Sequence, residues 1–351
     1  MTPDRPGLST PRLIGLDWGT TAMRCWLLGD NGRILDARRL AGGLLDMATG
    51  IDAADPAARA RAYEATFLDV CGPWLRAVPG LPALACGMVG SAQGWREAGY
   101  LDVPARLDIT GPDLTRVPLA GGTVHLVPGL RVPSDPCHDI AGDVLRGEET
   151  QVIGALESLD RPDAEHVLVL PGTHTKWIRI ADRKVLSFTT AMTGELYALV
   201  TQHGLLSHTG MTPRRDDAAF ARGLTAGFSA RDIGLAATLF GARALVLDGL
   251  LEPAALADYL SGVVIADEAR HLLPRHAGTQ RITLCGNGDL CRRYAAALRM
   301  RGVGTEVVGE DAAAAGLWSV AVAAGLVGVD GNTCWPDSGK RTPARRDSWS
   351  A

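Results

Sequence analysis

LIGLDWGTTAMRCWLL, residues 13–28, is the stretch of sequence that decides the fold. An apolar run ends at Asp17, the turn Gly19-Thr20-Thr21 follows, and a second, alternating run begins two residues later. This is the pattern of two strands joined by a short turn. The turn offers a carboxylate, a glycine that lets backbone amides approach a ligand, and two hydroxyls, which suit a phosphate chain with its divalent cation. Taken alone, the same residues are equally typical of an ordinary hairpin.

The same order of features occurs a second time in HVLVLPGTHTKWIRIADRKVLSFTT, residues 166–190. An apolar strand leads into the Gly172-Thr173 turn, and an alternating strand follows. In both copies a third strand comes next, in the first copy after Asn31-Gly32, a strong two-residue hairpin signal. Two such units predict two related domains that face one another. A phosphate chain held between two hairpins is the arrangement of the actin, hexokinase and sugar-kinase superfamily, which this sequence resembles.

The expected fold class is therefore α/β, with two ribonuclease H-like domains of the actin-like ATPase type facing a central cleft. The chain has 351 residues, of which 46% are hydrophobic, and this is enough to bury two cores of ordinary domain size. We predict an N-terminal domain over residues 11–135, a C-terminal domain over 136–332 and a disordered tail over 333–351. The tail contains Pro, Ser and basic residues without apolar periodicity.

Composition and charge argue against several classes of partner. The net charge is −4, and the basic cluster at 340–346 lies in the tail, where a solvated segment is more typical than a nucleic-acid arm. Residues 1–12 contain no apolar signal region, and later apolar stretches are broken by Gly or charge before the ~20 residues that a membrane span needs. Seven scattered cysteines form neither a disulfide framework nor a paired zinc site. We expect a cytoplasmic protein that binds neither nucleic acid nor membrane; a homo-oligomer is left open.

A glycine-rich stretch, GMVGSAQGW, follows a short apolar strand in the first predicted domain. So many glycines beside Trp and Ser indicate either an ordinary strand-to-helix turn or a backbone that lines a small polar ligand. On the second interpretation the substrate-binding candidates are Gly87, Met88, Gly90, Ser91 and Trp95.

Acidic residues cluster in DIAGDVLRGEETQVIGAL, residues 139–156, where apolar spacing in the second half predicts a helix. Acids near a helix N-terminus are favoured by the helix dipole, so they can be simple capping charges. A kinase, however, needs a carboxylate in the cleft that accepts the proton of the attacking hydroxyl. Glu148 lies 24 residues before Gly172, a spacing similar to that of sugar kinases in the resembled superfamily. Asp143 is the second catalytic candidate, and Glu149 and Asp139 stay open.

A third turn follows the strand predicted at 281–285, in the order Gly286-Asn287-Gly288, and a helix begins directly after it. A strand, a Gly-x-Gly turn and a helix suit close backbone approach to an adenosine. The segment does not match a dinucleotide fingerprint, because it lacks the third Gly and lies near the end of the chain. In third place after two phosphate turns, it resembles the adenosine-binding turn of the superfamily.

Five phrases identify a narrower resemblance: LDWGTTAMRCWL, GMVGSAQGW, RGEETQVIGA, LPGTHTKW and MTGELY, in this order over about residues 12–328. Together they are similar to the 2-dehydro-3-deoxygalactonokinase family. The resemblance implies transfer of the ATP γ-phosphate to the 6-hydroxyl of 2-dehydro-3-deoxy-D-galactonate, a step of D-galactonate catabolism, with Mg²⁺ and ATP as cofactors. The run DPCHDIAGDVL looks longer than is usual in the family, which leaves the identity of the base open.

The resemblance also implies roles for individual residues. Asp17 would hold Mg²⁺ directly or through water, and Lys176 would neutralise phosphate charge unless it is a solvent-facing strand lysine. The expected nucleotide-binding residues are those of the three turns: Gly19, Thr20, Thr21, Gly172, Thr173, Thr175, Lys176, Gly286, Asn287 and Gly288.

The carboxylate of a sugar acid calls for a cation, and Arg24, Arg96 and Arg146 are the candidates, among which the sequence does not choose. Residue types and spacing by themselves support a phosphotransferase that acts on a small polar molecule. The alternatives to the implied substrate are another hexose or hexonate and, in a different class of protein, a non-catalytic sugar-acid sensor.

Overall fold

The computed structural model describes residues 9–41, 55–204, 206, 212–229, 233–309 and 311–328. The predicted tail, 333–351, lies outside these described residues. No helix in the described part of the chain is long and apolar enough to cross a membrane.

The first hairpin unit forms one half of a six-stranded sheet whose order is β3-β2-β1-β4-β8-β7. β1 and β2 pair antiparallel, and β1 and β4 pair parallel. Helix α2 covers one face and begins where the Asp55 carboxylate accepts a hydrogen bond from the backbone N–H of Ala58 at 2.8 Å. The bounds are β1 Leu13–Trp18, β2 Ala22–Leu28, β3 Ile34–Ala41, α2 Pro56–Ala77, β4 Ala83–Cys86, β7 Thr115–Leu119 and β8 Gly122–Leu126.

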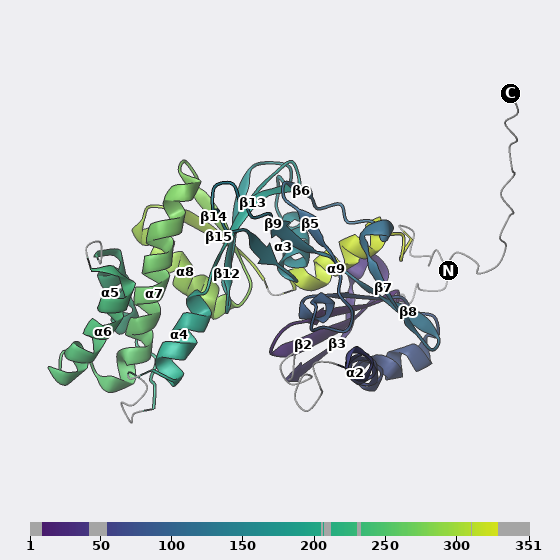
Figure 1. Ribbon diagram of the computed structural model, residues 1–351, viewed down its shortest axis with the longest axis horizontal. Coiled ribbons are helices and arrows are strands. Elements are labelled where there is room, and N and C mark those ends of the chain that lie inside the picture. Colours follow the sequence, from purple (N-terminus) through teal and green to yellow (C-terminus); the bar gives the residue numbers. More distant parts are fainter. Residues whose placement is uncertain are drawn as a thin grey trace, which may run out of the picture.

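The second hairpin unit forms a six-stranded sheet of order β15-β14-β11-β12-β13-β6. Its first five strands repeat the order β8-β4-β1-β2-β3 of the first sheet, so the chain contains the same sheet twice (Figure 1). This duplication confirms the predicted fold class. The bounds are β11 His166–Leu170, β12 Thr175–Ala181, β13 Lys184–Ala191, β14 Arg281–Cys285 and β15 Gly304–Val308.

Helices fill the sequence between β13 and β14 and gather on the far side of the second sheet (Figure 1). α5 and α7 pack so closely that a Cβ on Gly223 would lie 2.0 Å from the carbonyl oxygen of Tyr259. The bounds are α4 Thr193–Gln202, α5 Asp217–Ser229, α6 Gly234–Leu247, α7 Leu256–Leu272 and α8 Gly288–Met300.

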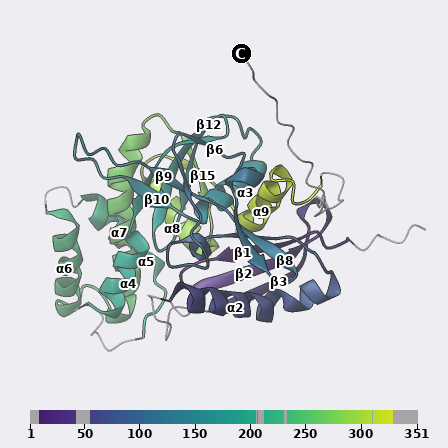
Figure 2. The same cartoon turned by 45° about the vertical axis from the view of Figure 1, so that its right-hand side comes forward.

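Two segments cross the predicted boundary between residues 135 and 136. Strand β6, Ala105–Arg106, pairs with β13 in the second sheet. Helix α9, Ala312–Ala323, returns to pack on β1 and β4 of the first sheet, opposite α2 (Figure 2). A small third sheet also mixes the two ranges, in the order β10-β9-β5, with β5 Tyr100–Asp102, β9 Gly129–Val132 and β10 Asp143–Leu145.

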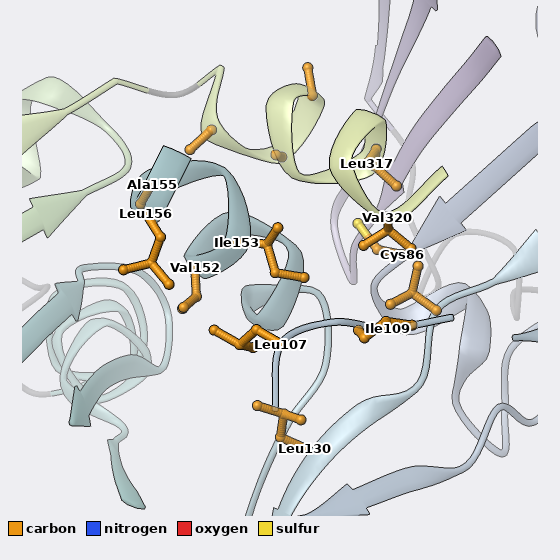
Figure 3. Close-up of a cluster of buried hydrophobic side chains, with 14 of the residues drawn as sticks. Cys86, Leu107, Ile109, Leu130, Val152, Ile153, Ala155, Leu156, Leu317 and Val320 are labelled. Atoms are coloured by element: carbon orange, nitrogen blue, oxygen red, sulfur yellow. The ribbon is translucent and has the colours of Figure 1, made fainter. Parts of the chain in front are cut away.

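Helix α3, Glu148–Glu157, crosses α9 in the core between the two large sheets. A Cβ on Gly154 would lie 1.9 Å from the carbonyl oxygen of Ala312, and one on Gly316 would lie 1.8 Å from that of Thr150. Only glycine therefore permits this crossing. Apolar side chains of both helices, among them Ile153 and Leu317, gather in the same cluster as those of the segment around β6 (Figure 3).

The helix expected in the second half of 139–156 is α3, which begins at Glu148. Ahead of it, residues 143–145 form strand β10. The strand and the helix are separated by the turn at Gly147, whose φ of 105° is incompatible with a right-handed helix.

Candidate active site

A cavity of about 640 Å³ lies where the three predicted turns meet. The residues that line it come from both halves of the chain. They belong to β1, β2, β3, β5, β10, α3, β11, β12, β14, α8 and α9 and to the turns next to these elements. The predicted residues among them are Asp17, Gly19, Thr20, Thr21, Arg24, Gly87, Met88, Arg146, Glu148, Gly172, Thr173, Lys176, Gly286 and Asn287. This volume is within the usual range of small-molecule sites.

In the first turn, Asp17 lies at the end of β1, directly opposite Arg24 of β2. The Arg24 Nη2 atom is 2.5 Å from Asp17 Oδ2, and the Asp17 side chain keeps 12% of its surface exposed. Gly87 packs beside this pair, with a φ of 90°, and a Cβ there would lie 2.7 Å from the carbonyl oxygen of Trp18. The Gly87 backbone is therefore close to the first strand because no side chain intervenes.

The second turn is attached to the start of helix α4. The backbone N–H of Glu195 donates to the carbonyl of Thr173 at 2.9 Å, and the Glu195 carboxylate lies 2.5 Å from His174 Nε2. Gly194 makes this contact possible, because a Cβ there would lie 2.3 Å from the carbonyl oxygen of Gly172. His174 is thus held in the turn by its contact with Glu195.

A buried hydrogen-bond network lies beneath the second turn. The Glu268 carboxylate accepts from Trp177 Nε1 at 2.6 Å and from the Tyr294 hydroxyl at 2.8 Å, and Thr175 Oγ1 lies 2.8 Å from that same hydroxyl. Burial raises the pKa of Glu268. Thr175 was expected to contact phosphate, but its side chain is fully buried here and does not line the cavity. The network connects β12 to α7 and α8.

Lys176 and Glu148 form an ion pair at the centre of the cavity wall. Lys176 Nζ is 3.0 Å from Glu148 Oε1 and also donates to the carbonyl of His174 at 3.0 Å. The lysine side chain is only 5% exposed, so it is not the solvent-facing strand residue considered as the alternative. The second carboxylate oxygen of Glu148 accepts from the backbone N–H of Arg146 at 3.1 Å.

Glu149 has a different environment although it is the next residue. It has no exposed surface and does not line the cavity. Its carboxylate accepts from the backbone N–H of Gly147 at 2.6 Å and from Thr150 Oγ1 at 3.0 Å. Burial, and then the charge of Glu148, raise the pKa of Glu149 to about 8.

The other two acidic candidates point away from the cavity. Both Asp143 carboxylate oxygens accept hydrogen bonds from Thr190, from the backbone N–H at 2.7 Å and from Oγ1 at 2.8 Å, which ties β10 to β13. Asp139 is exposed, in a turn with a φ of 52°. Neither residue lines the cavity. Among the acidic candidates, the cavity contains Glu148 and Asp17.

The glycine-rich segment divides into lining and supporting residues. Gly87 and Met88 line the cavity, whereas Gly90, Ser91 and Trp95 do not. Trp95 belongs to a buried aromatic cluster whose other members are Trp18, Tyr63 and Phe67. Ser91 is buried, and its hydroxyl has no hydrogen-bond partner among the described residues. Gly90 leaves room for the Arg146 guanidinium, since a Cβ there would lie 3.1 Å from Arg146 Nη1.

Three arginines line the cavity: Arg24, Arg146 and Arg39. Arg146 is buried, donates to the carbonyl of Ala98 at 2.7 Å, and places its guanidinium 4.2 Å from the Tyr100 ring centre. Arg96, the remaining sequence candidate, binds a backbone carbonyl of β7 on the surface instead.

Arg39 was not among the sequence candidates. It is exposed on β3, where its Cα is the register partner of Arg24. Aligning the second and third strands of the first hairpin unit in the sequence places Arg39 opposite Arg24. This alignment could have identified Arg39 as a further candidate.

The third turn precedes α8. Asn287 caps the helix, accepting from the backbone N–H groups of Asp289 at 3.0 Å and Leu290 at 3.3 Å. Gly286 has a φ of 135°, a conformation that glycine adopts readily. Gly286 and Asn287 line the cavity, whereas Gly288 begins the helix behind them.

Two sheets of one topology, with a cavity between their equivalent hairpin turns, define a phosphotransferase of the actin-like ATPase fold, the class that includes the sugar kinases. Comparison with known proteins narrows this class. The family model described as 2-keto-3-deoxy-galactonokinase matches residues 17–320, and the chain belongs to this family of ATP-dependent carbohydrate kinases.

Individual relatives agree with the family match. The chain is 36% identical, over 85% of its length and 92% of the relative's, to a probable 2-dehydro-3-deoxygalactonokinase of Rhizobium meliloti. It is 35% identical, over 89% and 98%, to the 2-dehydro-3-deoxygalactonokinase of Escherichia coli. Among solved structures it is similar to a crystal structure from Sinorhizobium meliloti, provisionally described as the same kinase, with a TM-score of 0.76, 34% identity, and coverage of 89% and 98%.

Proposed function

We propose that the protein transfers the γ-phosphate of ATP to the 6-hydroxyl of 2-dehydro-3-deoxy-D-galactonate, as a step of D-galactonate catabolism. The observation that carries the proposal is the Glu148–Lys176 pair in the wall of a cavity built from three backbone turns. A carboxylate that can accept a proton lies there beside a cation that can bind phosphate. The names of the two relatives supply the substrate.

The nucleotide would lie across the cavity. Gly19, Thr20, Gly172 and Thr173 offer backbone amides and hydroxyls to the phosphates, and the turn at Gly286 offers backbone to the adenosine. The described residues contain no cluster of three or more potential metal-ligating side chains. This fits Mg²⁺, which usually takes one or two carboxylates and completes its shell with phosphate oxygens and water.

Asp17 is the carboxylate at the end of β1 that would hold the metal, directly or through water. Bound there, Mg²⁺ would neutralise charge on the phosphate oxygens.

Glu148 acts as the base in the proposed reaction. When phosphate enters the cavity, Lys176 turns toward it, and the Glu148 carboxylate is released to accept the proton of the sugar hydroxyl. The hydroxyl oxygen then forms its bond to the γ-phosphorus while the bond to the ADP oxygen breaks. Most of the rate acceleration in such a reaction comes from positioning and charge stabilisation.

The carboxylate of the sugar acid requires a cation. Arg39 and Arg146 both line the cavity, Arg39 exposed and Arg146 buried, so the two provide an outer and an inner cationic contact. A guanidinium can bind a carboxylate with two parallel hydrogen bonds. An aldose or polyol would lack this contact, which favours an acid over a neutral sugar.

The substrate is tested by coupled ADP release with a panel of 2-keto-3-deoxy sugar acids, hexonates, aldoses and polyols. We expect the highest kcat/KM for 2-dehydro-3-deoxy-D-galactonate. Higher kcat/KM for another hexonate or a hexose would show that the chain is a kinase of different specificity. Binding of the acid without ADP release would instead indicate a sensor.

The base is tested by comparing Glu148→Gln with Asp143→Asn at saturating ATP, because each change removes a charge with little change in size. Glu148→Gln should lower kcat by at least the ~10²-fold typical of general-base loss. Asp143→Asn should retain most of kcat and lower the melting temperature through its lost bonds to Thr190. The reverse order of kcat losses would assign the base to Asp143, and small losses in both would leave Glu149 or Asp139.

A further inference from the structure

Helix α6 is apolar on both of its faces. Its sequence, GLAATLFGARALVL, contains one charged residue, Arg243. Thr238, Leu239 and Ala242 are buried against the rest of the protein, whereas Phe240 on the opposite face is 63% exposed. A helix that is hydrophobic all round is normally buried all round. The exposed face of α6 therefore lacks a covering surface within the described part of the chain.

The exposed side chains form one stripe, which we call the α6 stripe and define as Ile233, Ala236, Phe240, Ala244 and Leu247. Ile233 and Leu247, at 65% and 72% exposure, lie seven residues before and after Phe240. Ala236 and Ala244 lie four residues before and after it. Large and small side chains therefore alternate symmetrically about Phe240.

We propose that the α6 stripe is the interface of a homodimer in which α6 packs antiparallel against α6 of a second copy. A twofold axis at Phe240 places Ile233 of one copy against Leu247 of the other and Ala236 against Ala244. Such an isologous contact requires a surface that is complementary to itself, and the symmetric stripe meets this requirement. The alanines allow the two helices to approach to about 8 Å.

The available area places the proposed interface at the small end of the usual size range. The helix is about 21 Å long, and its stripe together with the 60% exposed Leu250 presents an apolar patch on the order of 500 Å². Two facing patches would remove about 1,000 Å² from water, the lower limit for a specific interface. Interfaces of this size are typical of weak, transient association, so we expect a dimer that dissociates on dilution.

The interface would leave the active site free. α6 lies at the far end of the second half of the molecule from the first sheet, and none of its residues lines the cavity (Figure 1). Changes in the α6 stripe should therefore alter association without altering kcat, whether or not the proposed substrate is correct.

Sedimentation velocity from nanomolar to high micromolar concentration tests the dimer, using the full-length protein. Phe240→Glu brings two like charges together at the axis and should leave a monomer with unchanged kcat and far-UV circular dichroism. Leu68→Glu is the matched control, because Leu68 is also an exposed apolar helix residue, at 43%, but lies on α2; this variant should dimerise like the wild type. A wild type that is monomeric throughout, or a Phe240→Glu variant that dimerises equally well, would overturn the proposal.

Cysteine cross-linking tests the antiparallel arrangement, in a background where Cys137 and Cys334 are replaced by Ser. Chains with Ile233→Cys should form disulfide-linked dimers with chains that carry Leu247→Cys, and neither should cross-link efficiently with itself. Efficient self-cross-linking of the Ile233→Cys chain would mean parallel packing and contradict the proposed axis. No cross-linking between the mixed chains would place the interface elsewhere.

Discussion

Glu148 and Glu149 are adjacent in the sequence and have opposite surroundings. Successive side chains of an α-helix point about 100° apart, so at the start of α3 one carboxylate faces the cavity and the other faces the core. Glu148 has Lys176 as its partner, whereas Glu149 has two uncharged hydrogen-bond donors. The second carboxylate is held protonated at neutral pH by its burial.

The raised pKa of Glu149 makes the free energy of unfolding depend on pH. The folded pKa of Glu149, about 8, is higher than the ~4.3 of an unfolded glutamate, so between these values the folded state holds a proton that the unfolded state lacks. The stabilisation that this proton gives the folded state is fully present below about pH 4.3. As the pH rises from there toward 8, the free energy of unfolding falls by about 1.4 kcal/mol per pH unit.

Glu149→Gln removes this loss. In urea unfolding at pH 5.5, 7 and 8.5, the variant should gain stability relative to the wild type as the pH rises. Glu97→Gln, at an exposed carboxylate, is the control and should show no such trend. A wild-type-to-variant difference that is the same at all three pH values would contradict the assigned burial effect.

Among the secondary-structure elements, the sequence predicted those whose formation depends on residues that are close together in the chain. The hairpin units, the three turns and helix α3 follow from alternation, turn residues and apolar spacing. Partners that come from distant segments could not be predicted in this way: Thr175 is bound by Tyr294, 119 residues away, and Asp143 by Thr190, 47 residues away. For the same reason the sequence indicated acids near a helix start but not which of them face the cavity.

The crossing of α3 and α9 also joins distant segments, and it depends on two glycines. Gly316→Ala should destabilise the protein by ~3 kcal/mol or more, because the new Cβ would meet a carbonyl oxygen of the neighbouring helix rather than a movable side chain. Gly241→Ala is the control: Gly241 also lies inside a helix but has no atom within 4 Å of its Cβ position, so this change should stabilise by about 0.5–1 kcal/mol. Urea unfolding measures both, and equal effects would show that the crossing can relax.

At the scale of the whole molecule, the two halves are related by duplication but are not separate along the chain. Each half contributes a segment to the other: β6 completes the second sheet and α9 covers the first. The cavity is also built by both halves, because its lining combines turns from each of them. The sequence predicted the duplicated units from their internal patterns, whereas the exchanged segments have no local signal, since a two-residue strand and an Ala-rich helix fit many positions.

The exchange of β6 and α9 determines how the gene can be divided. A polypeptide ending at residue 135 would expose the face of β1 and β4 that α9 covers, and one starting at 136 would lack the edge strand β6, so each should be insoluble when expressed alone. Co-expression of the two should restore soluble, active kinase by fragment complementation, detected by co-purification through a tag on one fragment. If the first fragment alone unfolded cooperatively in solution, α9 would be dispensable as its cover.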